Sequence, residues 1–318
     1  MRIVAALGGN ALLKRGETPD AEIQEHHILL AVEALAPLGR AHDLVITHGN
    51  GPQVGLLALE SDADPALSRA YPLDALGAQT QGMIGYWLAQ ALHNAVPARS
   101  FVALVCQTVV GADDPALAHP SKFVGQVYSK TQAERLARER NWEVRPDGSS
   151  WRRVVPSPMP REIVELSVIR QLLDAGTGVI CAGGGGIPVV REDDGRLRGI
   201  EAVVDKDRTA ALLAESVGAD ALLLLTDVAA VEVGYGTPSA RAMRHTSVEE
   251  LRGHEFSAGS MGPKVQAACD FVQATGHMAA IGLLEDAEAL LTGSTGTVIQ
   301  ALPPSTAAPA RSGSRPAT

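Results

Sequence analysis

The stretch between residues 177 and 215 constrains the fold of this chain more than any other. It reads TGVICAGGGGIPVVREDDGRLRGIEAVVDKDRTAALLAE. The apolar run at 177–182 is typical of a strand buried on both faces, and the four glycines after it let another group approach the backbone closely. A polar hairpin is expected at 193–198, and 209–217 has the apolar spacing of a helix. Strand, glycine-rich turn and helix in this order predict an α/β protein with a ligand site at the turn.

Asp205-Lys206-Asp207 stands directly before that helix. Asp205 is expected to be its N-cap, because the carboxylate can accept hydrogen bonds from N–H groups of the first turn. Lys206 would then project from a helix N-terminus, where a positive charge is unfavourable unless an anion lies nearby, and phosphate is the obvious anion. The alternative is a solvated charge cluster that opens a surface helix. The glycine run and the buried strand before it favour the functional interpretation.

Other apolar segments alternate with stretches of helical periodicity along the chain. Further strands are expected at 2–7, 43–47, 101–107, 221–225, 277–283 and 296–299. Further helices are expected at 22–38, 72–91, 160–175 and 263–273. This alternation predicts a mostly parallel central sheet that is covered by helices on both faces, which is a three-layer α/β/α sandwich.

Residues 111–158 interrupt this alternation. They contain a short charged helix near 130–141 and a polar hairpin near 147–150. The segment is too long for an ordinary connection, so we expect a small inserted subdomain, which at the mouth of an α/β site commonly acts as a lid. Residues 303–318 are rich in Pro, Ser, Ala and Arg without apolar periodicity, which predicts a disordered tail after a folded domain at 1–302.

The composition disfavours several classes of function. The chain has 318 residues with a net charge of −9 and no basic stripe, so we expect no nucleic-acid partner. No run reaches the ~20 apolar residues of a membrane-spanning helix, so we expect no membrane partner. The apolar N-terminal run is broken by Gly8-Gly9-Asn10, which predicts a strand and not a signal peptide. Cys106, Cys181 and Cys269 lie far apart in apolar runs, as is typical of free thiols in a reducing cytosol.

Glycine-rich turns follow Leu7, Thr47 and Ala182, and another precedes Lys264. None of them matches the pattern Gly-x-x-x-x-Gly-Lys-Ser/Thr, or Gly-x-Gly-x-x-Gly at the start of a helix. The chain also lacks the His/Cys spacing of a zinc site and the Gly-x-Ser-x-Gly elbow of a hydrolase. What remains is backbone N–H groups and isolated lysines with no evident nucleophile. Phosphoryl transfer needs little else, because it depends mainly on positioning and charge neutralisation.

Two lysines are placed best for that chemistry. Lys206 and Lys264 could hold the β- and γ-phosphates of a nucleotide from two sides, and Asp207 could orient these lysines or help to place a metal-bound nucleotide. Lys14 is either an active-site residue or a surface charge beside Arg15. His48 is expected to be a packed residue at a strand end and not a base.

Eight segments together resemble the carbamate kinases of the amino-acid kinase superfamily. They are ALGGNALL, VITHGNGPQVG, HPSKFVGQVYSK, VVPSPMPREIVE, VICAGGGGIPVV, GIEAVVDKDRTAALLAE, LLLLTDV and FSAGSMGPKVQAA. Each segment alone is weak evidence, but the eight occur in family order and with family spacing from about Arg2 to Ile299. The resemblance implies the amino-acid kinase fold. It places the phosphoryl acceptor in an N-lobe of about 1–195 and the nucleotide in a C-lobe of about 196–302.

The resemblance also implies an activity. Carbamate kinases transfer a phosphoryl group reversibly between ATP and carbamate, and they usually make ATP from carbamoyl phosphate and ADP in arginine and carbamoyl-phosphate catabolism. The implied cofactor is ATP or ADP with Mg²⁺, and the implied substrate is carbamate or carbamoyl phosphate. A cytoplasmic homodimer is the implied state, and no residue is assigned as a metal ligand.

The matching motifs carry family roles over to residues of this chain. The residues implied to contact the transferred phosphoryl group and carbamate are Gly8, Gly9, Asn10, Gly49, Asn50 and Gly51. The residues implied to be catalytic are Lys122 of the lid, the phosphate-binding Lys206 and Lys264, and the organising Asp207. The residues implied to bind the nucleotide are Gly184, Thr226, Asp227, Val228, Tyr235 and Met261. Tyr235 is alternatively a turn residue that packs on the sheet.

The chain departs from the family pattern at two places. The common Pro-Thr-Lys-Pro around the lid lysine reads Pro120-Ser121-Lys122-Phe123, which bears on the reach of Lys122. After Asp227, Ala229-Ala230 replaces the usual Asp-Gly step, which bears on nucleotide affinity.

Two other functions remain open from the sequence. An enzyme of the same fold could phosphorylate another small carboxylate, phosphonate or phosphate. A non-catalytic nucleotide sensor or storage protein could also use this scaffold, but such a protein would be expected to lose the lysines, and both Lys206 and Lys264 are present.

Overall fold

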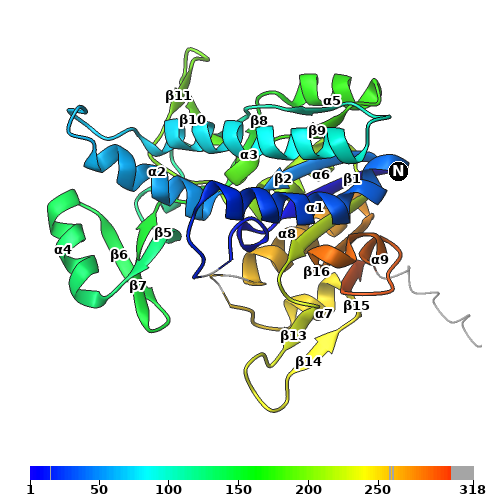
Figure 1. Ribbon diagram of the computed structural model, residues 1–318. Helices are drawn as coiled ribbons and strands as arrows, with labels where there is room; N and C mark the ends of the chain where they lie inside the picture. The colour runs from blue at the N-terminus through cyan, green and yellow to red at the C-terminus, as the bar shows by residue number, and fades with distance from the viewer. Residues whose placement is uncertain (15, 258, 260, 302–318) are drawn as a thin grey trace, which may run out of the picture.

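A computed structural model describes residues 1–14, 16–257, 259 and 261–301, without the side chain of Asn10. The tail predicted at 303–318 lies outside the described residues. Within those ranges, an eight-stranded sheet forms the centre of the molecule, as Figure 1 shows. No helix there has both the length and the apolar character needed to cross a membrane.

The central sheet is mostly parallel, as predicted. Its strands lie in the order β15 (His245–Ser247), β17 (Thr297–Gln300), β16 (Met278–Leu283), β12 (Ala221–Thr226), β1 (Arg2–Leu7), β2 (Asp43–His48), β9 (Gly178–Ile180) and β3 (Phe101–Ala103). From β16 to β3 every pair is parallel, whereas β17 runs antiparallel to β16. Pairing of β1 with β12 joins the two halves of the chain in one sheet.

Side chains along the strands alternate between two apolar layers. In β1, Ile3, Ala5 and Leu7 face one layer, and Val4 and Ala6 face the other. The first layer includes α1 (Ala21–Ala41), α3 (Leu73–Ala95) and α9 (Ala287–Leu291). The second layer includes α5 (Leu166–Asp174), α6 (Lys206–Ser216), α7 (Val248–Arg252) and α8 (Met261–Thr275). Because both faces are buried, the central strands are apolar runs, and the predicted α/β/α sandwich is confirmed.

Smaller elements surround this core. A four-stranded sheet has the order β11 (Leu197–Gly199), β10 (Ile187–Arg191), β4 (Gln107–Val110) and β8 (Pro160–Ile163). A hairpin is formed by β13 (Val231–Val233) and β14 (Arg241–Met243). The remaining helical elements outside the insertion are α2 (Gly51–Ala63), η1 (Gly9–Ala11), η3 (Gly183–Gly185) and η4 (Leu284–Asp286).

The segment 111–158 contains a sheet of its own. Its strands have the order β5 (Lys122–Tyr128), β7 (Ser150–Val155) and β6 (Glu143–Asp147). The helix α4 (Lys130–Arg140) packs on this sheet, and the short helical turn η2 (Pro115–Leu117) precedes β5 in the chain. These elements stand to one side of the main body, at the left in Figure 1. Helix α4 starts in a capping box. The Ser129 hydroxyl accepts from the backbone N–H of Gln132, and the Gln132 side-chain oxygen accepts from the backbone N–H of Ser129.

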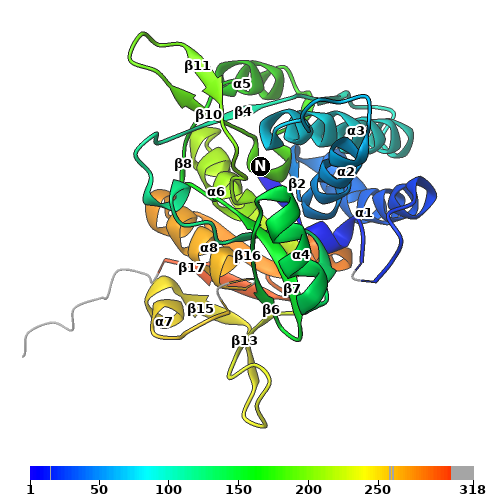
Figure 2. The same cartoon turned by 90° about the vertical axis from the view of Figure 1, so that its left-hand side faces the viewer.

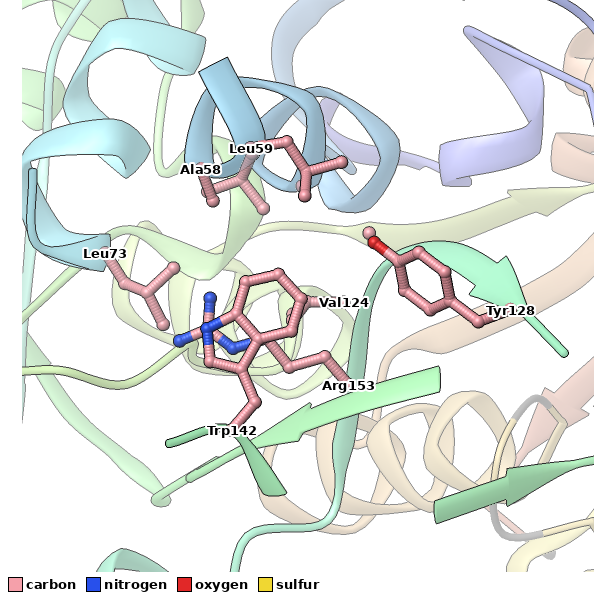
Figure 3. Close-up of a pocket in the computed structure, with 10 residues that line it drawn as sticks. Ala58, Leu59, Leu73, Val124, Tyr128, Trp142 and Arg153 are labelled. Carbon is pink, nitrogen blue, oxygen red and sulfur yellow. The ribbon is translucent and has the colours of Figure 1, made fainter. Parts of the chain in front are cut away.

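The insertion meets the main body at α2. A Cβ atom added at Gly55 of α2 would lie 2.0 Å from Cα of Gly125 in β5, so only glycine permits this approach of the two backbones. Figure 3 shows the side chains beside this contact, including Trp142, whose ring centroid lies 4.7 Å from the guanidinium carbon of Arg153. The free space between them is about 10 Å³, which is room for about one water molecule.

Two predicted elements differ from the structure in type or by more than four residues in their bounds. The strand predicted at 101–107 is split into β3 and β4, because the side-chain amide of Gln81 binds both N–H and C=O of Cys106 where the chain leaves the central sheet. The helix predicted at 160–175 begins only at Leu166. Its first residues instead form β8, which pairs antiparallel with β4, so tertiary pairing overrides the proline signal for a helix start.

Candidate active site

A cleft of about 910 Å³ is lined by the turns that follow β1, β2, β9 and β12. Parallel strands end at the same edge of a sheet, which brings these separate turns together. Every residue that the sequence predicted for the site lines this cleft except Asn10, whose side chain lies outside the described residues. The lining residues among those predictions are Gly8, Gly9, Gly49, Asn50, Gly51, Lys122, Gly184, Lys206, Asp207, Thr226, Asp227, Val228, Tyr235, Met261 and Lys264.

The glycine turns after β1 and β2 touch through their backbones. A Cβ atom at Gly49 would lie 2.8 Å from the backbone nitrogen of Gly9, and a Cβ atom at Gly8 would lie 3.2 Å from the carbonyl oxygen of Leu225. A side chain at Gly49 would therefore push the two turns apart, and one at Gly8 would press against the end of β12. The glycines leave the main chain at the floor of the cleft without side-chain cover, where free amide N–H groups can face an anion. The N–H groups of Gly8 and Gly49 themselves donate to the carbonyl oxygens of Leu225 and Leu7, at 2.9 and 3.0 Å.

The glycine run after β9 forms the next part of the wall. Ala182 and Gly184 adopt positive φ, 52° and 66°, and the Thr47 hydroxyl donates to the Ala182 carbonyl at 2.9 Å. Gly183 packs against the ring of His48, where an added Cβ would lie 2.3 Å from Nε2. Burial lowers the pKa of His48 to about 4, so this imidazole is neutral at pH 7. The expectation of a packed strand-end residue and not a base is consistent with this.

Helix α6 starts inside the cleft. Asp205 is its N-cap as predicted, since its Oδ1 accepts from the backbone N–H of Asp207 at 3.0 Å and of Arg208 at 3.3 Å. This cap fixes the first turn, from which Lys206 and Asp207 extend into a buried environment. Lys14, which the sequence left open between site and surface, is exposed and does not line the cleft.

One carboxylate joins two lysines from different helices. Asp207 accepts from Lys206 through Oδ1 and from Nζ of Lys264 through Oδ2, the latter at 2.9 Å. Helices α6 and α8 pack against each other, which brings Lys264 to Asp207, and Figure 2 shows them side by side. The side chains of Lys206, Asp207 and Lys264 are only 10 %, 6 % and 14 % exposed. The two ammonium groups thus share one cavity and one counterion.

Burial and charge act against each other in this cluster. Burial lowers the pKa of Lys206 to about 8, while the Asp207 carboxylate acts in the opposite direction. Burial also acts to raise the pKa of Asp207, but Lys206 and Lys264 outweigh it and hold that pKa far below its ordinary value. The cluster therefore carries two cations and one anion at neutral pH, a surplus of positive charge that suits a phosphate ligand.

The insertion contributes a third cation to the cleft. Lys122, the first residue of β5, forms an ion pair with Oδ2 of Asp205. Burial acts to raise the pKa of Asp205, but Lys122 outweighs it and holds this pKa below its ordinary value. One carboxylate thus caps α6 and holds the lysine of the insertion. The cap is predictable from the sequence but this pair is not, because its partners lie 83 positions apart and no local pattern connects them.

The residues predicted for the nucleotide lie along the rest of the cleft. Thr226 ends β12, and its hydroxyl donates to Oδ1 of Asp227 at 3.2 Å. Tyr235 lies in the loop between β13 and β14 and is 79 % exposed, so it borders the cleft and does not pack on the sheet. Met261 starts α8 and is partly buried. Gly184 borders the cleft beside Asn50, whose side chain packs against it.

Comparison with known families agrees with this architecture. The family model described as "Amino acid kinase family" matches residues 1–282. The chain belongs to the amino acid kinase family. Its members matched here include the carbamate kinase of Rhizobium meliloti, which is 52 % identical over 302 residues, or 94 % of this chain and 93 % of that protein.

Solved structures of the family are also similar. Carbamate kinase from Giardia lamblia bound to citric acid is 40 % identical, with a TM-score of 0.88 over 94 % of this chain and 98 % of that chain. The same protein bound to AMP-PNP is 39 % identical, with a TM-score of 0.84 and the same coverage. The matches span both halves of the chain, so the resemblance found in the sequence motifs is confirmed at the level of the family and its fold.

The coupling between Asp207 and Lys206 predicts a pH effect that is unusual for a lysine. We expect phosphoryl transfer to require the charged form of Lys206, whose pKa is about 8. The value of kcat/KM should therefore fall as the pH rises through about 8. Asp207→Asn removes the charge that raises the pKa of Lys206, so the fall should move to lower pH by roughly 1 unit or more. It should also lower kcat/KM at pH 7 by about 10²-fold.

The measurement is the pH profile of kcat/KM for phosphoryl transfer between pH 6 and 9.5. Asp193→Asn, at an exposed position of the β10–β11 hairpin, is the matched control and should keep the profile of the unchanged protein. An alkaline fall at the same pH in the Asp207→Asn and unchanged proteins would contradict this coupling.

Proposed function

We propose that this chain works as a carbamate kinase, transferring a phosphoryl group reversibly between ATP and carbamate. The observation that carries the proposal is the Asp207 carboxylate, which holds Lys206 and Lys264 in one cleft beside the bare turns at Gly8 and Gly49. Relatives named carbamate kinase, about half identical over nearly the whole chain, support the choice of reaction within the family.

The proposed direction in the cell is from carbamoyl phosphate toward ATP, as part of arginine or carbamoyl-phosphate catabolism. A terminal oxygen of the ADP β-phosphate attacks phosphorus, a new P–O bond forms, and the P–O bond to carbamate breaks. Carbamate leaves with the electron pair of that bond, so the step needs no redox partner and no covalent enzyme intermediate. Negative charge is spread over the moving group in the transition state, and its neutralisation is the main task of the protein.

The lysines and the backbone share that task in this proposal. Lys206 and Lys264 neutralise the transferred group from two sides, and Asp207 keeps both ammonium groups at fixed positions. The turns that contain Gly8, Gly9 and Asn10, and Gly49, Asn50 and Gly51, bind the transferred group and carbamate. Lys122 reaches the substrate from the insertion, which acts as a lid. The nucleotide lies along Gly184, Thr226, Asp227, Val228, Tyr235 and Met261.

We further propose that the nucleotide is used as its magnesium complex. In the described ranges, no three His, Cys, Asp or Glu side chains gather where they could hold a metal ion. A single carboxylate at the cleft is enough for an ion that is carried by nucleotide phosphates and water, since Mg²⁺ commonly binds through substrate phosphates with one or two carboxylates. Asp207 is the carboxylate that would help to place it. When bound, the ion would neutralise charge on the β- and γ-phosphates.

We also propose that the chain forms a homodimer through the face of α1 and α3, which lie side by side in Figure 1. Gly82 in α3 is exposed, and an added Cβ there would meet no atom within 4 Å, although a helical glycine destabilises by up to ~1 kcal/mol. Tyr86 of α3 and Leu29 of α1 are 57 % and 54 % exposed. A partner packed closely on this face would offset the glycine and cover these side chains.

Sedimentation velocity tests this assembly. The expected mass is about twice 33.2 kDa, and Gly82→Arg should shift it toward the monomer, because the long side chain fills the proposed contact. A monomer at micromolar concentration without any substitution would contradict the dimer.

A cytoplasmic location is also proposed, and it is supported by the free buried thiols of Cys106, Cys181 and Cys269.

The activity itself predicts ATP formation from ADP and carbamoyl phosphate in the presence of Mg²⁺. Lys206→Ala should lower kcat by about 10²-fold or more, because it removes a preorganised charge from the transferred group. The measurement is coupled ATP production by the purified proteins, with circular dichroism to confirm folding. Arg196→Ala, on an exposed hairpin away from the cleft, is the control and should keep the original rate.

Two outcomes separate this function from its alternatives, and a third tests the role of Lys206. No turnover with carbamoyl phosphate, but labelling of another small carboxylate or phosphate by labelled ATP, would assign a different acceptor on the same fold. ATP binding without turnover of any acceptor would support a sensor. An undiminished rate in Lys206→Ala would refute the role given to this lysine.

A further inference from the structure

The side-chain amide of Asn50 is held on two sides. Asn50 is the N-cap residue of α2, lines the cleft and is 6 % exposed. Its Nδ2 donates to Oγ1 of Thr80 in α3 at 2.8 Å. Its flat face lies against Gly184, where an added Cβ would come within 2.5 Å of Nδ2, Cγ and Oδ1. The amide therefore has little freedom to turn within the cleft wall.

Thr80 decides which end of that amide faces it. Thr80 is fully buried and does not line the cleft. Its Oγ1 donates to the carbonyl oxygen of Gly77 at 2.8 Å, which is the usual back-bond of a helical threonine. A hydroxyl has one proton, so toward Asn50 it can only accept, and the hydrogen-bond network assigns the amide nitrogen to this side.

This orientation leaves a specific chemistry for a ligand. With one N–H of Nδ2 bound to Thr80, the Asn50 amide retains its second N–H and its oxygen Oδ1. None of the hydrogen bonds among the described residues uses Oδ1 of Asn50. A small ligand beside the turns at Gly9 and Gly49 therefore meets an acceptor whose position is fixed by two neighbours.

We propose that Thr80 is a positioning residue for substrate selection: it fixes the Asn50 amide so that Oδ1 accepts a hydrogen bond from the amino group of carbamate. The inference rests on the proposed function, which makes carbamate the small substrate. Carbamate differs from acetate in one respect that matters here, because its amino group donates hydrogen bonds and a methyl group cannot. A site built around a fixed acceptor disfavours the analogue that leaves this acceptor unpaired.

The test compares carbamoyl phosphate with acetyl phosphate as phosphoryl donors to ADP. Thr80→Val keeps the size of the side chain but removes the acceptor for Nδ2, so the Asn50 amide is no longer held in one orientation. It should lower kcat/KM for carbamoyl phosphate by about 10-fold and change that for acetyl phosphate by less than about 2-fold. Thr80→Ser keeps the hydroxyl and should preserve the ratio of the two values.

Thr80→Ala removes the same hydrogen bond without adding an apolar branch, and it gives the same comparison if Thr80→Val does not fold. Where acetyl phosphate turns over too slowly, its inhibition constant against carbamoyl phosphate replaces its kcat/KM. If kcat/KM falls by the same factor with both phosphoryl donors, Thr80 has a purely structural role and the inference is overturned. An unchanged ratio of the two kcat/KM values in both Thr80→Val and Thr80→Ala overturns it as well. If the unchanged protein itself makes no ATP from carbamoyl phosphate, the proposed function falls and this inference falls with it.

Discussion

The cleft depends on a single shared carboxylate. Two ammonium groups that are about nine-tenths buried would repel each other and lose their hydration, and lysines in that situation tend to release their protons. Asp207 prevents this by accepting from both, with one oxygen for each lysine. The balance stays incomplete, since the pKa of Lys206 is lowered to about 8 even with the carboxylate present. The cluster is held together, but it still lacks one negative charge, and an incoming phosphate supplies that charge.

The sheet determines where this surplus charge lies. Strands β1, β2, β9 and β12 are parallel, so the turns that follow them meet at one edge. Gly49 and Gly9 allow the first two turns to touch, and Gly184 allows the third to pack on Asn50. Helix α6 then starts at the same place, with Asp205 as its cap. Fixed backbone groups and fixed cations are thereby arranged before any substrate binds, which is the arrangement that electrostatic catalysis requires.

The insertion also presents a lysine that is held by a carboxylate. The chain is acidic, with a net charge of −9, and each of the three lysines at the cleft is paired with a carboxylate. Here Lys122 binds Asp205, and Lys206 and Lys264 bind Asp207, so each cation has a defined position without a ligand. A phosphate that takes over Lys122 from Asp205 would also bear on the insertion, because this lysine opens β5. This pair is one of several links between the insertion and the main body, beside the ion pairs Arg140–Asp62 and Arg153–Glu201.

Much of this could be predicted from the sequence, for physical reasons that differ between elements. The strand at 2–7 has the bounds predicted for it, because a strand buried on both faces is an unbroken apolar run. Lys206 was predicted for the site because a cation between glycine-rich backbone and a helix start needs an anion. Contacts between distant segments could not be predicted, as the break at Cys106 depends on Gln81 and the pair of Lys122 depends on Asp205. Thr80 has no motif, and only its hydrogen bond to Asn50 reveals it.

A crystal structure of the protein with ADP, Mg²⁺ and tetrafluoroaluminate tests the central claim most directly, because this anion mimics the phosphoryl group in transfer. We expect Nζ of Lys206 and Nζ of Lys264 both to lie within about 3 Å of fluorine atoms of the same anion. We also expect Asp207 still to accept from both lysines. An anion bound by only one of these lysines, or a cleft in which the two ammonium groups point away from each other, would contradict it.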